Sequence, residues 1–506
     1  MSSLWCRITL ILLCCTSSAV QAASLQNNVI TVAIEHTPSV FNPFSEQTQM
    51  ASQFRHLFFD PLFRWGPDQK IENRLVKSWQ RINEKTVRFQ LRKNIYFSSG
   101  HQLTSQDVIW SLSKAKKKAN NTLFNNVENI TIHDQYRFDI RSRLSTIQLL
   151  DYLTNIFILD SAFYEQHPQL LNQKPRLITV NTTDLPFSGT GPYRLYQYNP
   201  LVGIEVIANP TYWDGAPAIK LLRFMQVNKA QSRLFALLAN DVQISAAIPS
   251  NSLQGIQRGN GKAIMQTASP NAVFLSINDK LSPALKSEKL RMALHLAIDQ
   301  AGMLKHVFNG AGRLQTVFAS FNQAANGDTS EQPAFASSVY DLDAAKALLK
   351  KMTLPKQLSL LVKRDQQGDV AAVAQSLKRM LKRIDIEVSI EFVDADDIWN
   401  KKNLYFDLTL SAWHTQLLSR DNIYDELFIN SELSDYLRDK SEQGRVANNF
   451  SAKSEYFELL LKQEWIIPLF SENTVWGSSQ AVNLQDIFSV NGIPYWSLLA
   501  PVTAEH

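Results

Sequence analysis

Two turn signals that bracket a pair of short strand-like runs constrain the fold of this chain most strongly. The first signal reads G-T-G-P-Y at residues 189–193, and the second reads N-P-T-Y-W-D-G at residues 209–215. Between them, apolar and polar residues alternate as they do in half-buried paired strands. We expect Gly189 and Gly191 to adopt backbone angles that other residues avoid, while Pro192 fixes a further angle. The segment predicts a β-hairpin, and a hairpin alone is compatible with many functions.

The composition is that of a large folded protein with no sign of a nucleic-acid partner. The chain has 506 residues, of which 45% are hydrophobic and 19% charged, so it is long enough for two or three domains. The formal net charge is only +5, and the longest basic run is Lys116 to Lys118. A triplet of this kind is typical of a solvated helix face.

The first 22 residues have the pattern of a secretory signal peptide. Arg7 supplies a positive charge, residues 8–15 form an apolar core, and Val20-Gln21-Ala22 fits the small-x-small cleavage rule. The apolar stretch is too short to span a bilayer. We therefore expect an exported, periplasmic protein that is cleaved near Ala22, and no anchoring span.

All three cysteines lie inside this leader, at positions 6, 14 and 15. The mature chain would then contain none, which excludes thiol catalysis and thiolate metal sites. A lipoprotein signal is the alternative, but it needs a small residue before the lipid-bearing cysteine, and Leu13 precedes Cys14.

Hydrophobic periodicity predicts an alternation of strands and helices along much of the chain. Predicted strands cover residues 28–35, 87–91, 358–362, 386–393 and 406–412, and predicted helices cover 50–63, 300–308, 343–352 and 370–384, with further helices starting near Thr104 and Ser287. The strand–helix–strand order in the second half predicts an α/β lobe with a partly parallel sheet.

Five polar residues in these segments have structural interpretations. Thr104 and Asp107 form a capping-box pattern at a helix start, and Asp299 is placed to cap the helix that follows it. His295 stands among apolar residues of a helix, where a structural role is expected. Asp385 follows a helix and can adopt the left-handed angle that ends it.

Local signatures of enzyme chemistry are absent from the sequence. It contains no H-E-x-x-H pair, no G-x-S-x-G elbow and no G-x-x-x-x-G-K phosphate loop. We expect no catalytic residues, no cofactor and no metal site. Carboxylates that are distant in sequence could still meet in space as an acid–base pair, so an enzyme remains an alternative.

The residue strings themselves resemble a known family. The segment from Gly189 to Gly215 is similar to the "GTGPY … NPxYW" segment of extracellular solute-binding proteins of family 5, which feed peptide-type ABC importers. Further similarities occur in family order at residues 41–43, 71–112, 291–299, 340–349 and 406–413. The resemblance implies an α/β fold of the type II periplasmic binding protein class, cluster C-like, with two α/β lobes around a cleft and an extra α+β domain.

The resemblance also implies how the chain is divided. Lobe I is expected to be discontinuous, formed by residues 23–62, 186–268 and 474–506. The extra domain takes residues 63–185, and lobe II takes residues 269–473. Clefts between lobes are preferred ligand sites, and the lobes of such proteins close on their ligand by a hinge motion.

Ligand-site residues follow from the same resemblance. The expected regions are the loop with Glu46 and Gln47, the strand from Asn271 to Ser276, which in relatives pairs with an extended peptide, the loop with Arg364, and the segment after strand 406–412. The candidate residues are Glu46, Gln47, Asn271, Phe274, Arg364, Trp413, His414, Gln416 and Asp421. Aromatic side chains among them suit varied ligands, since they supply contact area at low entropic cost.

Gln416 departs from the pattern of the family. Peptide binders usually have "WxxDY" here, and the aspartate pairs with the α-amino group of the peptide, whereas this chain has Trp413-His414-Thr415-Gln416-Leu417. A charge-assisted hydrogen bond contributes roughly 1.5–3 kcal/mol, against about 1 kcal/mol for a neutral one. Amine capture should therefore be weaker, unless Asp421 or Glu46 substitutes. The alternative is that Trp413 only packs within the lobe and Gln416 is a surface turn residue.

The resemblance implies a periplasmic solute-binding protein, expected to be a monomer, that delivers a solute to an inner-membrane ABC permease with its ATPase. Peptides are the expected cargo. One alternative keeps the fold and changes the cargo to a metal chelate, haem, a sugar or an antimicrobial peptide. The other is a non-transport periplasmic sensor; the leader and the strand beginning at residue 28 leave no room for a fused DNA-binding domain.

Overall fold

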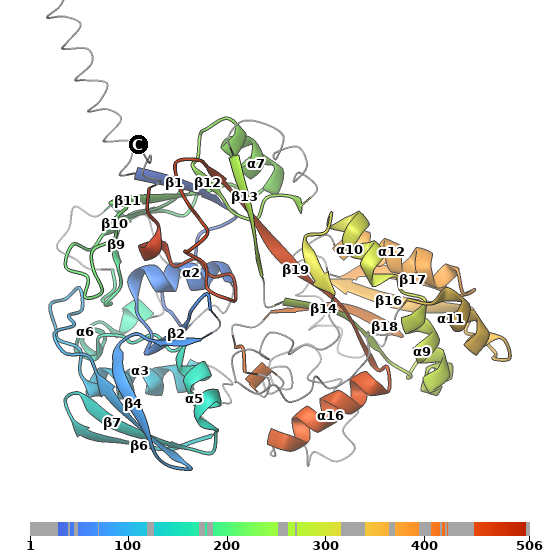
Figure 1. Ribbon diagram of the computed structural model, residues 1–506, viewed down its shortest axis with the longest axis horizontal. Coiled ribbons are helices and arrows are strands. Elements are labelled where there is room, and N and C mark those ends of the chain that lie inside the picture. Colours follow the sequence, from blue (N-terminus) through green and yellow to red (C-terminus); the bar gives the residue numbers. More distant parts are fainter. Residues whose placement is uncertain are drawn as a thin grey trace, which may run out of the picture.

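The fold has two α/β lobes and an extra domain beside lobe I (Figure 1). The structure is a computed structural model. It describes residues 29–38, 41–44, 49–68, 70–118, 126–171, 178–179, 186–250, 262–268, 271–314, 340–363, 370–393, 406–414, 417–419, 422–423 and 450–501. Lobe I and lobe II share one long sheet, in the order β17-β16-β18-β14-β19-β12-β1-β11-β10-β9-β8. The extra domain has its own four-stranded sheet.

Lobe I is built on seven of the described strands and the helices that cover them. The strands are β1 (Val29–Ile34), β8 (Ile178–Thr179), β9 (Tyr193–Asn199), β10 (Gly203–Ala208), β11 (Leu221–Gln226), β12 (Ile244–Ser245) and β13 (Lys262–Ala268), and the helices are α2 (Gln49–Phe58), α7 (Ala230–Leu238) and η5 (Trp496–Leu498). The central strand β1 runs parallel to β11 and β12. It lies between two strands and under helices, which is why its sequence is almost continuously apolar.

The extra domain is an antiparallel sheet covered by helices on one face. Its strands are β4 (Val76–Asn83), β5 (Thr86–Leu91), β6 (Val127–Asp134) and β7 (Arg137–Ser142), its helices are α3 (Ser105–Lys118), α5 (Thr146–Leu153), α6 (Ser161–Gln166) and η1 (Pro168–Leu171), and the small pair β2 (Phe63–Trp65) and β3 (Ile71–Asn73) adjoins it. The predicted alternation is confirmed, because Val87, Phe89 and Leu91 are buried while the residues between them are half-buried.

Lobe II confirms the predicted strand–helix–strand order. Its strands are β14 (Asn271–Ile277), β15 (Gly312–Leu314), β16 (Gln357–Lys363), β17 (Glu387–Val393) and β18 (Leu408–His414), and its helices are η3 (Pro283–Lys286), α9 (Glu288–Leu296), α10 (Gln300–Val307), α11 (Leu342–Leu349), α12 (Val370–Lys382) and α16 (Phe450–Lys462). The sheet is partly parallel as predicted, since β16 runs parallel to both β17 and β18.

One strand, β19 (Ile466–Ser479), runs through both lobes (Figure 1). Its first part pairs with β14 and β15 in lobe II, up to the pair of Gly312 with Glu472. Its second part pairs with β13 and β12 in lobe I, beginning with the pair of Ala268 with Asn473. The change of partner falls between Glu472 and Asn473, so the lobes are joined by continuous backbone there.

Helix ends agree with most of the predicted caps. The carboxylate of Asp299 accepts a hydrogen bond from the backbone N–H of Gly302 at 2.7 Å and caps α10. Asp385 has a φ of 62°, the left-handed angle expected of it. His295 is buried, and its Nδ1 lies 2.6 Å from Glu464 Oε2, which confirms a structural role. The first helix is shorter than predicted, because α2 ends at Phe58 and residues 59–62 leave the helical path.

The predicted hairpin is confirmed, but the reason for its glycines is different. Strands β9 and β10 pair antiparallel, with a register shift between Glu205 and Val206. The positive-φ residues do not include Gly189 or Gly191. Both glycines instead lie against the backbone of α2: a Cβ on Gly191 would lie 2.3 Å from Phe58 C, and one on Gly189 would lie 2.2 Å from Phe58 O. Close approach of two backbones, rather than an unusual angle, requires glycine here.

Side chains from both turn signals donate hydrogen bonds to one buried carboxylate. Asp60 is 4% exposed and accepts hydrogen bonds from Thr190 Oγ1, Tyr212 OH and Trp213 Nε1 at 2.9, 2.7 and 2.9 Å. Arg74 lies 3.8 Å from the same carboxylate and forms an ion pair with Asp214 at 2.7 Å. Three side chains from the hairpin motif thus hold it to Asp60, just before the extra domain begins.

Candidate functional site

Three of the four predicted ligand regions begin or end at one edge of the lobe II sheet. Trp413 and His414 are the last residues of β18, and they pair with Ala272 and Asn271, the first residues of β14. Strand β16 runs parallel to β18 and ends at Lys363, directly before Arg364. Because the carboxyl ends of parallel strands meet at the same edge, the loop with Arg364 starts on the edge where β18 ends.

Other candidate residues lie outside the described residues or inside a core. Glu46, Gln47, Arg364, Gln416 and Asp421 belong to the first group, as do the side chains of Asn271, Trp413 and His414. Phe274 is 1% exposed and packs within a buried hydrophobic cluster. A direct contact between its ring and a ligand would require this core to open.

The pairing of β14 restricts how a peptide could add to it. Residues Val273 to Ser276 pair with β18 on one side and with β19 on the other. Their backbone hydrogen-bonding groups are therefore used within the sheet. The expectation that an extended peptide pairs along Asn271 to Ser276 is wrong for most of that length, and only the first two residues of the strand remain candidates.

Three residues beyond β18, the chain contacts the extra domain at a buried acid that was not among the predicted site residues. Asp151, in α5, is 0% exposed. Its carboxylate accepts hydrogen bonds from the backbone N–H groups of Leu418 and Ser419, at 3.1 and 3.0 Å. It also accepts from Asn422 Nδ2 at 2.8 Å and from Trp65 Nε1 at 2.8 Å.

Burial and hydrogen bonding act in opposite directions on Asp151. Burial raises the pKa of this carboxyl above its usual value, while the four hydrogen-bond donors favour the charged form. The signal in the sequence is a single acid within an apolar helix, T-I-Q-L-L-D-Y-L. Such a residue is rare in a buried helix unless it has partners. Trp65 is 86 residues away and the other three partners are more than 260 residues away, so the sequence alone could not reveal them.

Apolar contacts accompany the polar ones. Leu418 is 1% exposed and packs with Trp65 in a small cluster. Leu417 and Ile423 belong to the same hydrophobic cluster as the core of the extra domain. The described residues between 417 and 423 are thus bound to the extra domain on both polar and apolar sides.

The rings of Tyr495 and His56, both from lobe I, lie next to this contact. The hydroxyl of Tyr495 donates to the backbone carbonyl of Trp65 at 2.8 Å, and the ring of His56 packs edge-on against the ring of Tyr495 at 4.8 Å. The guanidinium of Arg64 also lies over the ring of Tyr495, 4.5 Å from the ring centre. Burial, with the nearby Arg64 and Arg55, lowers the pKa of His56 well below its usual value, so this imidazole is neutral.

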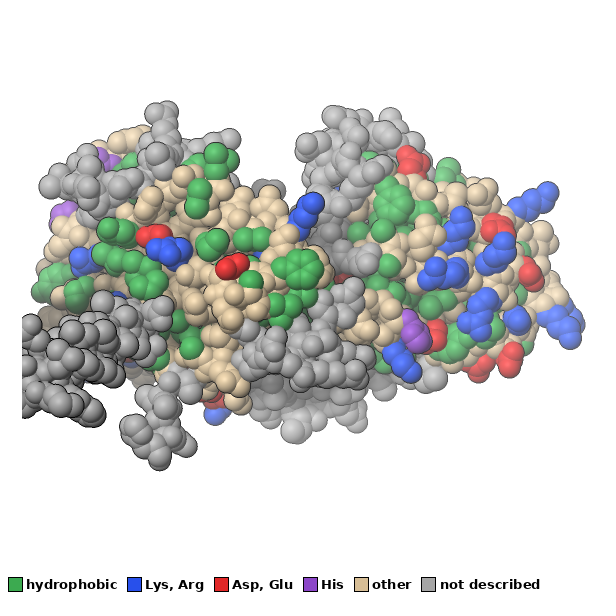
Figure 2. Space-filling view, turned by 90° about the horizontal axis from the view of Figure 1, so that it is seen from above, with side chains coloured by type: hydrophobic (Ala, Val, Ile, Leu, Met, Phe, Trp, Pro, Cys, Tyr) green, Lys and Arg blue, Asp and Glu red, His purple; other side chains and the backbone are tan. Residues whose placement is uncertain are grey.

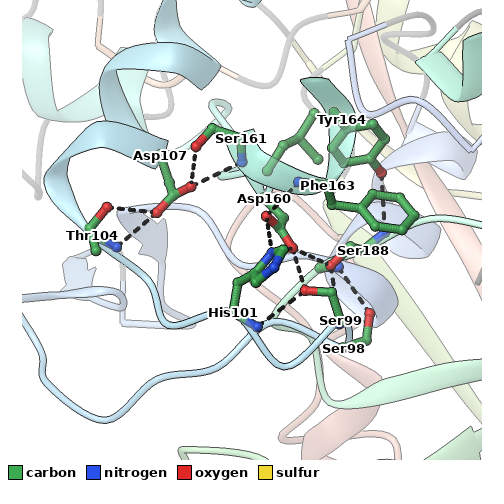
Figure 3. Close-up of polar contacts among 12 residues, drawn as sticks. Ser98, Ser99, His101, Thr104, Asp107, Asp160, Ser161, Phe163, Tyr164 and Ser188 are labelled. Carbon is green, nitrogen blue, oxygen red and sulfur yellow. Dashed lines mark hydrogen bonds and ion pairs between the residues drawn. The ribbon is translucent and has the colours of Figure 1, made fainter. Parts of the chain in front are cut away.

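A second polar group, in the extra domain, contains the residue types of a hydrolase but not the arrangement (Figure 3). The buried carboxylate of Asp160 lies 3.0 Å from His101 Nδ1 and accepts from Ser188 Oγ at 2.9 Å and from Ser99 Oγ. It also caps α6 through the N–H of Phe163.

A Ser-His-Asp relay needs the serine hydroxyl on the far nitrogen of the imidazole. Among the described residues no serine is hydrogen-bonded to Nε2 of His101, and both serines contact the carboxylate instead. The group holds the loop with Ser99 and the loop with Ser188 against α6, which is a structural task.

The described part of the chain contains neither a metal-binding cluster nor a membrane-spanning helix. No group of three or more His, Cys, Asp or Glu side chains is arranged there to hold a metal ion. None of its helices has the length and apolar character needed to cross a bilayer. Seen from above, Lys and Arg side chains gather over the lobe II end of the molecule, with acidic side chains among them (Figure 2).

Comparison with known proteins identifies one family. The family model described as bacterial extracellular solute-binding proteins, family 5 Middle, matches residues 70–435, which is well over half of the chain.

Curated relatives from several bacteria are similar over most of their length. The nickel-binding protein NikA of Staphylococcus aureus is 25% identical over 360 residues, covering 70% of this chain and 69% of the relative. The dipeptide-binding protein of Escherichia coli is 25% identical and covers 67% of this chain and 66% of the relative. The di/tripeptide-binding protein 2 of Pseudomonas aeruginosa is 24% identical and covers 80% of both.

Solved structures confirm the fold. The periplasmic binding protein DppA of Helicobacter pylori, in complex with the peptide STSA, has a TM-score of 0.69 at 17% identity and covers 96% of this chain. The dipeptide binding protein of a Pseudoalteromonas species, in complex with Met-Leu, has a TM-score of 0.71 at 16% identity and covers 94% of this chain. In both cases the whole of the solved chain is covered.

Proposed function

We propose that this chain, which belongs to the bacterial extracellular solute-binding proteins of family 5, captures peptides and delivers them to an inner-membrane ABC permease with its ATPase. The family match over residues 70–435 carries the proposal. Peptides are favoured because relatives from E. coli and P. aeruginosa are named for dipeptides and tripeptides. The activity is binding and delivery by a monomer, without catalysis.

The location follows from the leader and from the relatives. Residues 1–22 have the pattern of a secretory signal, and the family is extracellular. We propose that the chain is exported to the periplasm and cleaved after Ala22. N-terminal sequencing of protein from a periplasmic fraction should begin at Ala23, and recovery of the uncleaved chain in the cytoplasm would contradict this.

The proposed lobe boundaries are those implied by the resemblance: lobe I from 23–62, 186–268 and 474–506, the extra domain from 63–185, and lobe II from 269–473. Strand β8 is an exception, because Ile178 and Thr179 lie before residue 186 but pair with β9 of lobe I. The boundaries are supported by β19, which changes partner between Glu472 and Asn473, and by the ends of β13 and β14 at Ala268 and Asn271. Both connections between lobes I and II then pass through the same short stretch of sheet.

The proposed site lies at the sheet edge where β18 ends and β14 begins. It consists of the predicted regions that begin or end there, together with the loop that contains Glu46 and Gln47, and Phe274 belongs to the adjoining core rather than to the surface. The residues proposed to contact the ligand are Trp413, His414, Gln416, Asn271, Arg364, Asp421, Glu46 and Gln47.

A nickel complex is the second candidate ligand. The first reason is the S. aureus relative, which is a nickel-binding protein and has been solved with Ni(L-His)2. The second is Gln416, because a neutral amide captures an α-amino group less strongly than an aspartate does.

Calorimetry on the purified protein distinguishes these ligands. The panel consists of di-, tri- and tetrapeptides of alanine, the same tripeptide with an acetylated amino group, and Ni(L-His)2. Binding of free peptides supports the peptide proposal, and binding of Ni(L-His)2 alone supports the second candidate. If no member binds and mass spectrometry finds no co-purified solute, the role in transport is contradicted.

The variant Gln416→Asp tests the site itself. If Gln416 faces the α-amino group, a charged acceptor should tighten binding of the free tripeptide roughly tenfold, since charge-assisted bonds are stronger by about 1–2 kcal/mol. The acetylated tripeptide serves as the control and should gain nothing. Equal changes for both peptides would place Gln416 away from the amino group.

A further inference from the structure

The contact between Asp151 and the residues that follow Gln416 joins three segments of the chain. Asp151 belongs to α5, a helix that lies on the side of the extra domain turned toward lobe II (Figure 1). Trp65, its first partner, ends β2. Leu418, Ser419 and Asn422 follow β18, a central strand of lobe II.

The four hydrogen bonds to this carboxylate need two acceptor oxygens, which an uncharged side chain does not provide. Its Oδ1 accepts from Trp65 and Leu418, and its Oδ2 accepts from Ser419 and Asn422. Two of the donors are backbone N–H groups and one is an indole N–H, and these groups cannot act as acceptors. Both oxygens of position 151 must therefore be acceptors.

The partner on the lobe II side is built for the same contact. Asn422 is 0% exposed, and its Nδ2 also donates to the backbone carbonyl of Gln148 at 3.0 Å, one turn earlier in α5. A single side chain thus bonds to both a backbone carbonyl and the carboxylate of the same helix. These two hydrogen bonds fix both the distance of Asn422 from α5 and its position along the helix.

The buried charge is retained at a cost that its partners must offset. Moving a carboxylate out of water without partners costs several kcal/mol, and four donors recover much of this. If the segment left α5, Asp151 would lose three of its four hydrogen bonds at once. The hydrogen bonds therefore strongly favour one position of the segment on α5 over any other.

We propose that Asp151 is a positioning residue for ligand binding, which holds Leu418, Ser419 and Asn422 on the extra domain and thereby fixes the position at which the chain leaves the end of β18. This inference rests on the proposed function, because it assumes that the end of β18 lies at the ligand site. Only Thr415 and Gln416 separate the end of β18 from the fixed segment. With so short a connection, displacement of one end must move the other.

The first test measures the contact without any ligand. In Asp151→Asn, an amide NH₂ replaces one acceptor and opposes donors whichever way it is turned. We expect hydrogen exchange at the amides of Leu418 and Ser419 to accelerate about tenfold or more, because buried hydrogen-bonded amides exchange only when the contact opens. Exchange equal to that of the wild type would overturn the proposal.

Asp160→Asn is the matched control. Asp160 is also a buried carboxylate in the extra domain with several donors, but its partners Ser99, His101 and Phe163 lie within that domain and Ser188 lies just beyond it (Figure 3). It should leave exchange at Leu418 and Ser419 unchanged. Acceleration in both variants would mean general loosening of the domain and would contradict a specific contact.

Asn422→Ala approaches the same contact from the lobe II side, so that the test does not depend on one variant folding well. Single and double variants of Asp151 and Asn422 form a cycle. If the two side chains act on each other, the exchange effect in the double variant should be clearly smaller than the product of the single effects. Multiplicative effects would exclude direct coupling.

The second test measures the positions of the lobes. Spin labels on cysteines introduced at the exposed Lys77, in β4, and Lys346, in α11, report the distance between the extra domain and lobe II. We expect Asp151→Asn to shift or broaden the distance distribution, while Asp160→Asn retains that of the wild type. An unchanged distribution in Asp151→Asn would show that the contact does not link these two parts.

The calorimetric panel then separates this inference from the proposed function. Any solute that binds the wild type should bind Asp151→Asn about tenfold or more weakly, and Asp160→Asn equally well. Unchanged affinity with accelerated exchange would refute the positioning role alone. If no solute of the panel binds the wild type, the proposed function fails, while exchange and distance measurements still decide whether Asp151 joins the two parts.

Discussion

At the scale of single residues, buried carboxylates organise this molecule. Asp60, Asp151 and Asp160 are each at most 4% exposed, and each receives hydrogen bonds from at least three side-chain or backbone donors. Each joins segments that are distant in sequence. The donors offset the cost of burying the charge, so removal of the acid leaves several buried donors without an acceptor.

Asp60→Ala should lower the free energy of unfolding by about 3–5 kcal/mol, because Tyr212, Trp213 and Thr190 lose their shared acceptor and Arg74 loses a nearby counter-charge. Denaturant titration of the purified variants measures this. Asp214→Ala is the control: this acid contacts the same arginine, but its side chain is 45% exposed. The expected loss for it is about 1 kcal/mol or less, and equal losses would contradict the importance of the buried acceptor.

At the scale of elements, close approach of backbones determines how the β9–β10 hairpin motif sits on α2. The backbone N–H of Gly191 donates to the carbonyl of Phe58 at 3.0 Å, and the carbonyl of Gly189 accepts from Ser98 at 3.0 Å. The segment before β9 thus follows the end of α2 with no space for side chains. Its glycines are steric requirements of packing between elements.

Gly191→Ala should destabilise the protein by more than about 2 kcal/mol, because its Cβ would lie 2.5 Å from Leu57 O and 2.3 Å from Phe58 C, both backbone atoms. Gly100→Ala serves as the comparison, since Gly100 has a φ of 93° and nothing within 4 Å of a Cβ. That change should cost only about 1 kcal/mol of backbone strain. Thermal unfolding followed by circular dichroism would rank the two, and the reverse order would refute the steric explanation.

At the scale of the whole molecule, the C-terminal residues complete the core of lobe I. Trp496 is 1% exposed, packs against Phe224 of β11 and Trp476 of β19, and donates from Nε1 to Gln53 of α2 at 3.2 Å. These partners come from segments that are as far as 443 residues apart. The chain therefore returns to lobe I after it has built lobe II.

Trp496→Ala should cost about 3–5 kcal/mol, as expected for removing a large buried aromatic side chain. Leu498→Ala changes the same short helix, but Leu498 is 43% exposed, so its loss should stay below about 1 kcal/mol. Denaturant unfolding monitored by tryptophan fluorescence and circular dichroism measures both. A small effect of Trp496→Ala would mean that the C-terminal segment is not needed to close the lobe I core.

Much of the architecture could be predicted because periodicity reports burial locally. The alternation in β5, the order of strands and helices in lobe II, and the left-handed angle at Asp385 are confirmed. The predicted helix is longer than α2, since Phe59 and Leu62 are apolar and buried without being helical. Hydrophobicity in that stretch reflects the core around it rather than a helical face.

The sequence by itself determined the element types, the resemblance to a solute-binding family and the departure at Gln416, because each of these depends on residues that are close together in the sequence. Only the tertiary structure decided that β19 joins both lobes, that β14 is paired on both sides, and that Asp151 accepts hydrogen bonds from the residues after β18. These features depend on which distant segments meet, and a buried acid looks the same in a sequence whatever donors surround it. Contacts over hundreds of residues are settled by the packing of the whole chain.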